Sequence, residues 1–363
     1  MADKTVSATA LRRQLAAIFD GWGFEPSHID DIVMLMVESD LRGIDSHGVG
    51  KIKLYEKHFR EGRINPTPKI RIVRDLPALA LVDGDNGMGH LSSKFATETA
   101  IAKAREEGVG AVSVRHSYHI GACGIYAGMA ADAGMIGMAM TGATQLTMVP
   151  TFGRMSRMAT NPIAFAAPGR RNPPFSLDMA TTTVAVGKID IARWQGKPIP
   201  EGWANDETGR PETDPNAALA VEPKRLTPLG GTRERGSHKG YGLAAMVETL
   251  VTVLSGSQSA GRNLRTGERG KYVDVGHFYL AIDPAFFRGG PGSFEDDLDS
   301  LVDWLHATPP VDPARPVMVP GDPEHAARAE REQSGIPMTA SLLAEVREVA
   351  EAAGAEYFLE DER

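Results

Sequence analysis

Short apolar segments of strand length alternate with longer helical segments between residues 70 and 143, and this alternation constrains the fold more than any other feature. The expected strands cover residues 70–75, 78–85, 110–116 and 135–143, and the run HFYLAID adds a further strand at 277–283. The expected helices between them cover residues 92–108 and 122–133. Alternating elements of this kind bury their apolar faces against one another in layers. The sequence therefore predicts a mixed α/β sheet.

Helical patterns dominate both ends of the chain. Residues 9–23 and 27–43 form the first two expected helices, the second with Ser27 as its N-cap. The strongest helical pattern covers residues 239–256, and we expect this apolar helix inside the core. Two amphipathic helices, 324–335 and 338–354, close the chain, and loops are expected at 196–235 and 288–296. A chain of 363 residues exceeds the usual size of one core, so we expect two domains, or one domain with a large insertion.

Composition excludes several classes of protein. The net charge is −8 and no run of basic residues could follow a phosphate backbone, which argues against nucleic acid as a partner. One cysteine cannot form an internal disulfide, and the first residues, MADKTVSATALRRQL, lack the apolar run of an export signal. Residues 242–254 are too short to cross a bilayer and contain Glu248. We expect a cytoplasmic protein without membrane contact.

A glycine-rich turn, GDNGMGH at residues 84–90, stands where a dinucleotide-binding turn would be found, between an expected strand and an expected helix. The Rossmann fingerprint G-x-G-x-x-G would require glycine at the position of Ser92, and no acidic residue follows at the required distance. The sequence therefore predicts a plain strand-to-helix turn here and no Rossmann site.

The stretch RHSYHIGACG, residues 115–124, allows three interpretations. A zinc site at His116 and His119 would need further ligands that are distant in sequence, such as His47, His238 or Asp45. Cys123 would need a nearby base to act as a nucleophile, and a small packing role suits it better. His119 follows a strand and precedes a glycine, a position that suits proton transfer, although a turn histidine bonded to the backbone remains the alternative.

A second group of polar residues follows the glycine-flanked turn at Ser46 and His47. Lys51 and Tyr55 follow at intervals of four, so a helix would present the three side chains of His47, Lys51 and Tyr55 on one face. These donors could hold a carboxylate, whereas the alternative is an ordinary solvated helix face. Further along, GSHKGYG at 236–242 resembles a phosphate-binding helix start, and Asp178 is either a helix N-cap or a ligand contact.

Eight motifs in one order carry a resemblance to a known family. They are DLRGIDSHGVG, VDGDNGMGH, VRHSYHIGACGIYA, ATNPIAFAAPG, LDMAT, PLGG, HKGYGLAAMVE and VPGDPEHAARAE. Over residues 7–340 the chain resembles the type 2 malate/L-lactate dehydrogenases, a family that also contains ureidoglycolate, sulfolactate, diketogulonate and cyclic imine (piperideine-carboxylate) enzymes.

The resemblance implies a non-Rossmann mixed α/β fold in which helices flank a largely antiparallel sheet. A helical domain would consist of residues 1–70 with 311–363 and would carry the SHG motif. A cofactor-binding and catalytic domain would consist of residues 71–310, with a loop-rich insertion at 196–235. The family's dimers further imply a homodimer with its site near the subunit contact.

The resemblance also assigns roles to residues. His119 would be the proton donor or acceptor and His47 its catalytic partner, with Ser46, Lys51, Tyr55 and Asn161 binding substrate. NAD or NADP would be held by Ser176, Leu177, Asp178, Met179, Ala180, Thr181, His238, Lys239, Gly240, Pro320, Gly321 and Asp322, with no metal. Relatives often carry arginine at position 51 and asparagine at position 116, and residues 141–153 depart from the versions found in some members.

The expected function is an NAD(P)-dependent oxidoreductase that interconverts a small 2-hydroxy acid, such as malate or lactate, and its 2-oxo acid. One alternative is reduction of a cyclic imine or a diketo sugar acid in the same site. Another is a metal-dependent hydrolase or lyase that uses His116 and His119.

Overall fold

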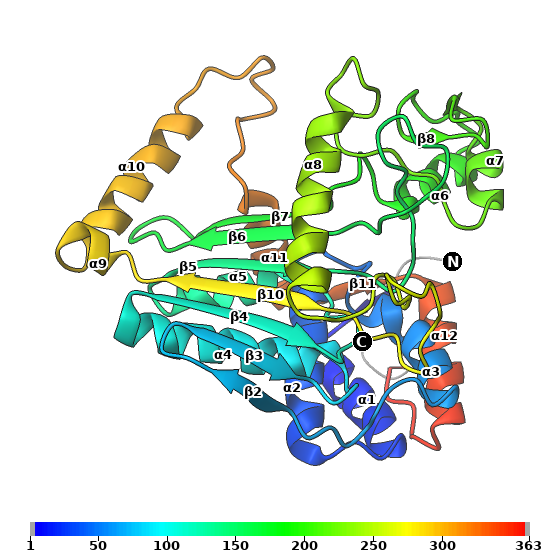
Figure 1. Ribbon diagram of the computed structural model, residues 1–363, viewed down its shortest axis with the longest axis horizontal. Coiled ribbons are helices and arrows are strands. Elements are labelled where there is room, and N and C mark those ends of the chain that lie inside the picture. The colour runs from blue at the N-terminus through cyan, green and yellow to red at the C-terminus, as the bar shows by residue number, and fades with distance from the viewer. Residues whose placement is uncertain (1–3, 360–363) are drawn as a thin grey trace.

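The computed structural model describes residues 4–359 (Figure 1). A seven-stranded sheet has the strand order β2-β3-β4-β10-β5-β6-β7. Its strands are β2 (Arg71–Asp75), β3 (Leu79–Asp83), β4 (Val109–Arg115), β5 (Ile136–Thr141), β6 (Ile163–Ala167), β7 (Phe175–Met179) and β10 (His277–Ile282). Every neighbouring pair is antiparallel except β3 and β4, which are parallel. The prediction of a mixed, largely antiparallel sheet is confirmed.

Helices cover both faces of this sheet. On one face, α4 (Gly89–Glu107) and α5 (Cys123–Asp132) pack on alternate side chains of the strands, such as Val112, Ala139 and Tyr279. On the other face, α8 (Ser237–Glu248) continues into a π-helical turn, η2 (Thr249–Val253), and packs on Met140 and Phe278. Adjacent strand residues point to opposite faces, so both layers are built from one alternating pattern.

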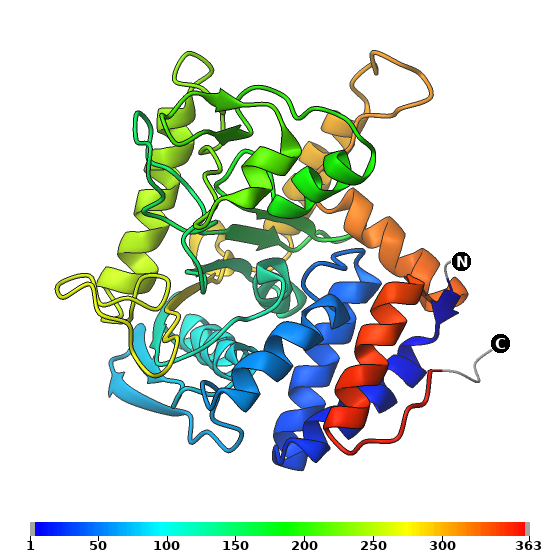
Figure 2. The same cartoon turned by 90° about the vertical axis from the view of Figure 1, so that its right-hand side faces the viewer.

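The first and last segments of the chain share a second core. It is formed by α1 (Ala8–Gly21), α2 (Pro26–Leu41), η1 (Val49–Lys51), α3 (Ile52–Arg60) and α12 (Ala340–Ala352). The short strands β1 (Lys4–Val6) and β11 (Ile336–Met338) pair beside it, and α11 (Asp322–Ser334) contacts α2. Figure 2 shows the red α12 alongside the blue helices from the start of the chain. This arrangement gives α3, which carries Tyr55, a fixed support.

Several local expectations are wrong. The α2 helix begins at Pro26 with Glu25 as its N-cap, so Ser27 lies inside the helix. The apolar helix at 239–256 does not lie inside the core, because Met246, Val253 and Leu254 are exposed on its outer side. One face of this helix packs on the sheet and the other faces outward.

Two predicted loops contain ordered structure. The segment 196–235 holds β8 (Ala204–Asn205), β9 (Pro211–Glu212) and α7 (Pro215–Ala220). With α6 (Val186–Trp194), these elements enclose a small core of their own around Ile189, Ile199 and Leu226. The segment 288–296 begins at the last residue of α9 (Ala285–Arg288) and includes the start of α10 (Ser293–His306). Tertiary packing therefore orders stretches whose local composition is typical of loops.

Candidate active site

The loop between β4 and α5 presents His119 at one edge of the sheet. Its backbone turns at His116, with φ +51°, and at Gly121, with φ +73°. Tyr118 and Ile120 on either side are buried, whereas His119 keeps part of its surface accessible. The loop thus anchors itself through its apolar neighbours and leaves the imidazole available to a ligand.

Two groups contact Nδ1 of His119. The Tyr55 hydroxyl lies 2.8 Å away, and the Gly121 backbone N–H donates to Nδ1 at 3.2 Å. An N–H group can only donate, so the Gly121 contact favours the ring form whose Nδ1 is unprotonated. Burial, followed by the nearby charges of His47 and Lys51, lowers the pKa of His119 well below its ordinary value of 6.5. The imidazole is therefore neutral at physiological pH.

The SHG turn lies against the same imidazole. The ring centroids of His47 and His119 are 5.6 Å apart with an interplanar angle of 21°, and Ser46 Oγ lies 2.8 Å from His47 Nδ1. Burial and the Lys51 charge lower the pKa of His47 to about 4, and burial lowers the pKa of Lys51. The structure therefore brings His47, Lys51, Tyr55 and His119 together, although they come from two distant parts of the sequence.

The buried carboxyl group of Asp40 holds the chain just after the SHG turn. Asp40 on α2 accepts a hydrogen bond from the Val49 backbone N–H at 2.8 Å. Burial raises the pKa of Asp40 to about 8. A Cβ atom on Gly48 would lie 2.1 Å from Asp40 Oδ1, so the glycine of SHG is required by this close approach. Sequence reasoning missed Asp40, which is one acidic residue within an ordinary helical pattern.

Two fully buried histidines near the site were also missed. The ring of His90 lies 5.9 Å from that of Tyr55, and within residues 4–359 neither of its ring nitrogens has a hydrogen-bond partner. His277 lies between Thr141 Oγ1 at 2.7 Å and Ser117 Oγ at 2.8 Å. Burial lowers the pKa of each histidine to about 3, so both are neutral. The one available signal was His90 at the end of the glycine-rich turn GDNGMGH, and that motif does not indicate that the side chain is buried.

The predicted cofactor residues meet along the edge strand β7. The Ser176 N–H donates to Pro320 O at 3.0 Å, and a Cβ on Gly321 would lie 3.2 Å from Ser176. At the other end of the run, Leu229 N–H donates to Thr181 O, and Leu229 also packs closely on Gly240. Two separate motifs thus flank the segment 176–181, one at each end.

Asp178 connects this edge strand to the segment that follows the His119 loop. Its Oδ2 accepts a hydrogen bond of 2.6 Å from the Gly124 N–H in the first turn of α5, five residues after His119. The prediction that Asp178 caps the segment after it is wrong, because it binds the start of a different helix. A carboxylate is favoured at that position by the positive end of α5.

Exposed His238 and Lys239 form the first turn of α8, beside Gly236 and buried Gly240. Two N–H groups of this turn already have backbone acceptors, since Ser237 N–H donates to Thr232 O and Lys239 N–H to Gly236 O. The positive end of a helix with a lysine nearby still suits the pyrophosphate of a dinucleotide. The remaining cofactor candidate, Asp322, accepts from the Val319 N–H at 2.7 Å and lies 2.8 Å from His306 Nε2. The start of α8 and the Asp322 carboxylate offer donors and an acceptor of the kind that NAD or NADP needs, without a Rossmann turn.

Other candidates are engaged elsewhere. His116 Nδ1 lies 3.0 Å from Asp83 Oδ2, and its backbone N–H donates to Asp274 Oδ1 at 2.6 Å. In the described part of the chain, no three His, Cys, Asp or Glu side chains are grouped so that they could hold a metal ion. Burial raises the pKa of Cys123 well above its ordinary value, which makes it a poor nucleophile. In that part of the chain, His116 and His119 therefore have no third side chain of these types grouped with them.

Asn161 is buried with φ +38°, and both ends of its amide have protein partners. Its Nδ2 donates to Glu248 Oε2 at 2.6 Å, and its Oδ1 accepts from the Ala159 N–H at 3.0 Å. These contacts fasten the turn before β6 to α8.

The chain is similar in sequence and in structure to known dehydrogenases. The sequence profile of the malate/L-lactate dehydrogenase family matches residues 6–347. A malate dehydrogenase of Pyrococcus horikoshii is 38% identical over 88% of this chain and 88% of its own length. An L-sulfolactate dehydrogenase of Methanocaldococcus jannaschii is 36% identical over 88% of this chain and 89% of its own. The crystal structure of malate dehydrogenase from Entamoeba histolytica superposes with a TM-score of 0.89 at 28% identity, covering 98% of this chain and 99% of that chain.

Among the described residues, no helix has the length and apolar character of a membrane span.

Proposed function

The chain belongs to the malate/L-lactate dehydrogenase family, and from this premise we propose that it is an NAD(P)-dependent oxidoreductase of small 2-hydroxy acids. The observation that carries the proposal is the convergence of His119, Tyr55, Lys51 and His47 at one edge of the sheet. A proton-transfer group, a cation and two further polar side chains are what a 2-hydroxy or 2-oxo acid requires.

Each residue has a defined task in this proposal. The Lys51 ammonium attracts the substrate carboxylate, with His47 and Ser46 beside it. To take the hydroxyl proton on Nε2, His119 adopts the other ring form, in which Nδ1 carries the ring hydrogen. Nδ1 then no longer accepts from the Gly121 N–H and donates to the Tyr55 oxygen, 2.8 Å away. A bound nicotinamide would accept the hydride from C2, or return it in the reverse direction. The groups along β7 and at the start of α8 would bind that cofactor.

A direct assay of cofactor absorbance tests the proposal. Purified protein is mixed with NADH or NADPH and a panel of 2-oxo acids, cyclic imines and diketo sugar acids, and loss of reduced cofactor is followed. We expect turnover with at least one 2-oxo acid, and full activity after treatment with a chelator. Reduced cofactor that stays unconsumed across the whole panel, or activity that the chelator abolishes, contradicts the proposal.

The homodimer remains a prediction, which analytical ultracentrifugation would test.

Replacement of Lys51 by glutamine is expected to raise KM for the acid substrate about 10- to 100-fold and to change kcat less, because a charge-assisted contact to the carboxylate is lost. Lys53→Gln is the matched control, since Lys53 lies two residues away and pairs with Glu348 and Glu56 on the surface. Steady-state kinetics with each variant measures the effect. An unchanged KM in Lys51→Gln would remove Lys51 from the substrate site.

The low pKa of His119 predicts different pH dependences for the two directions of reaction, a flat profile for oxidation and a falling one for reduction. Between about pH 6 and pH 8 the ring is neutral, so oxidation of the hydroxy acid should show no slope from this group. Reduction needs the protonated ring, whose fraction falls tenfold for each pH unit above the pKa, so kcat/KM for the oxo acid should fall about tenfold per unit. A plateau in the reduction profile across this range would contradict the assigned protonation state.

A further inference from the structure

The α3 helix contacts the loop that carries His119 at two successive residues of that loop. Tyr55 reaches His119 itself, with its hydroxyl 2.8 Å from Nδ1. Further along the helix, Nδ1 of His58 shares a buried hydrogen bond with the hydroxyl of Tyr118, the residue directly before His119. Residues three apart on a helix lie on the same side of it, so one face of α3 binds both loop residues.

The rings of these residues also pack against one another. Tyr118 lies edge-on to both residues of α3, with its ring centroid 5.6 Å from that of His58 and 6.0 Å from that of Tyr55. The ring of Tyr55 in turn lies 5.8 Å from that of His119. Tyr55 and Tyr118 are almost completely buried, so neither ring can move without displacing its neighbours. A shift of Tyr118 would therefore be passed on to the imidazole of His119.

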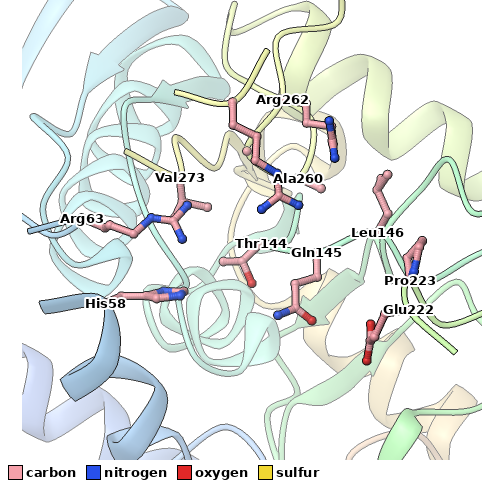
Figure 3. Close-up of a pocket in the computed structure, with 12 residues that line it drawn as sticks. His58, Arg63, Thr144, Gln145, Leu146, Glu222, Pro223, Ala260, Arg262 and Val273 are labelled. Carbon is pink, nitrogen blue, oxygen red and sulfur yellow. The ribbon is translucent and has the colours of Figure 1, made fainter. Parts of the chain in front are cut away.

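On its other side, His58 borders a cavity of about 330 Å³. Figure 3 shows the His58 ring directed into this cavity from one side, next to Arg63, with Glu222 on the opposite side. Neither Tyr118 nor His119 belongs to the lining. Close packing therefore restrains the His58 ring on the Tyr118 side only, and the hydrogen bond to the Tyr118 hydroxyl fixes its orientation.

Both partners of this hydrogen bond are neutral. Burial, followed by the Arg63 charge, lowers the pKa of His58, and burial raises the pKa of Tyr118. A hydrogen bond between neutral side chains contributes modestly to stability, but its loss leaves a buried polar atom without a partner. The bond is thus suited to setting the position of the loop at neutral pH.

We propose that His58 and Tyr118 are positioning residues, whose hydrogen bond places the loop so that His119 meets both the Tyr55 hydroxyl and the substrate. The inference rests on the proposed function and adds to it two residues that act through His119. A displacement of about 1 Å at the reacting atoms can cost about 10²-fold in rate. The rate, rather than substrate binding, is therefore the quantity that responds to loss of the bond.

Steady-state kinetics of three variants test this inference. Tyr118→Phe removes the hydroxyl and keeps the ring. We expect it to lower kcat for an oxo acid about 10- to 100-fold and to leave KM for the acid within about threefold of wild type. His58→Phe should show a similar loss. The double variant should lose no more than the larger single loss, because both substitutions break the same bond.

Tyr272→Phe is the matched control. Tyr272 lies on the loop before β10 with its ring 5.0 Å from Lys271 Nζ, and within residues 4–359 its hydroxyl has no hydrogen-bond partner. This variant should keep wild-type kcat. Wild-type kcat in Tyr118→Phe overturns the inference, even if the melting temperature falls, because the bond would then serve stability alone. A raised KM with unchanged kcat, or single losses that multiply in the double variant, overturns it as well.

Hydrogen exchange tests the positioning without turnover. The Gly121 N–H is bonded to His119 Nδ1 in the wild-type loop. In Tyr118→Phe the peptide that covers residues 116–122 should exchange about fivefold faster, or more, because loss of the bond lowers the free energy of local opening. Unchanged exchange in this peptide overturns the inference. If the wild-type protein reduces no oxo acid, the proposed function fails, and exchange at 116–122 then decides by itself whether the pair positions the loop.

Discussion

Alanine in place of His119 is expected to lower kcat by about 10²- to 10⁴-fold, the usual contribution of a positioned proton-transfer group. The substitution removes Nε2, which would exchange the proton with substrate, and leaves the Tyr55 hydroxyl without its partner at 2.8 Å. Stopped-flow and steady-state rates in both directions measure the loss. Cofactor affinity, measured separately by NADH fluorescence, should change little, since the proposed cofactor residues lie on β7, α8 and α11.

His116→Asn is the control for this experiment. His116 lies three residues from His119 and binds Asp83, and asparagine tolerates the positive φ of that position. We expect this variant to keep kcat within a few-fold of wild type. If His119→Ala turns over at near-normal rate, or if His116→Asn shows the larger loss, the assignment of the proton-transfer group is wrong.

Alanine in place of Gly89 is expected to damage the site without touching a reacting group. Gly89 begins α4, and a Cβ there would lie 2.1 Å from the carbonyl oxygen of Tyr118 and 2.6 Å from that of His119. Both are backbone atoms, so the catalytic loop must shift. A displacement of about 1 Å at the reacting geometry can cost about 10²-fold in rate, and overpacking of this kind costs about 1–3 kcal/mol in stability.

Gly187→Ala provides the comparison, because a Cβ at Gly187 meets nothing within 4 Å and its φ is ordinary. This substitution in the first turn of α6 should leave kcat unchanged and leave stability unchanged or slightly raised. Thermal unfolding and kcat/KM are measured for both variants. A Gly89→Ala enzyme with wild-type kinetics would show that the loop tolerates movement and that His119 does not depend on its present position.

Local sequence patterns predicted most strands of the sheet but not their order. The strands at 110–116 and 277–283 are visible in the sequence as short, largely apolar runs, because helices cover both faces of the sheet there. The position of β10 between β4 and β5 depends on pairings across more than a hundred residues, which no local pattern records. The α10 helix was not predicted, and its buried Asp299 acquires backbone partners at 170–172 only through the tertiary fold.

The sequence predicted which residues of the candidate site lie close together within one segment, but not the contacts between distant segments. Lys51 and Tyr55 follow His47 at helical spacing, so their common location could be expected from the sequence. Contacts between distant segments could not be expected in the same way. Tyr55 was assigned to the substrate, yet its hydroxyl contacts His119, and His277 becomes a neighbour of the catalytic loop through Ser117. Burial of a single histidine is set by long-range packing and leaves no periodic signal.

The central place of β10 has a consequence for biosynthesis. Synthesis proceeds from the N-terminus, so β2 to β7 leave the ribosome well before residues 277–282 do. Until β10 arrives, β4 and β5 each expose an unpaired edge, which is a template for pairing with other chains. A nascent polypeptide interrupted before residue 277 is therefore expected to aggregate more readily than one in which β10 has been made.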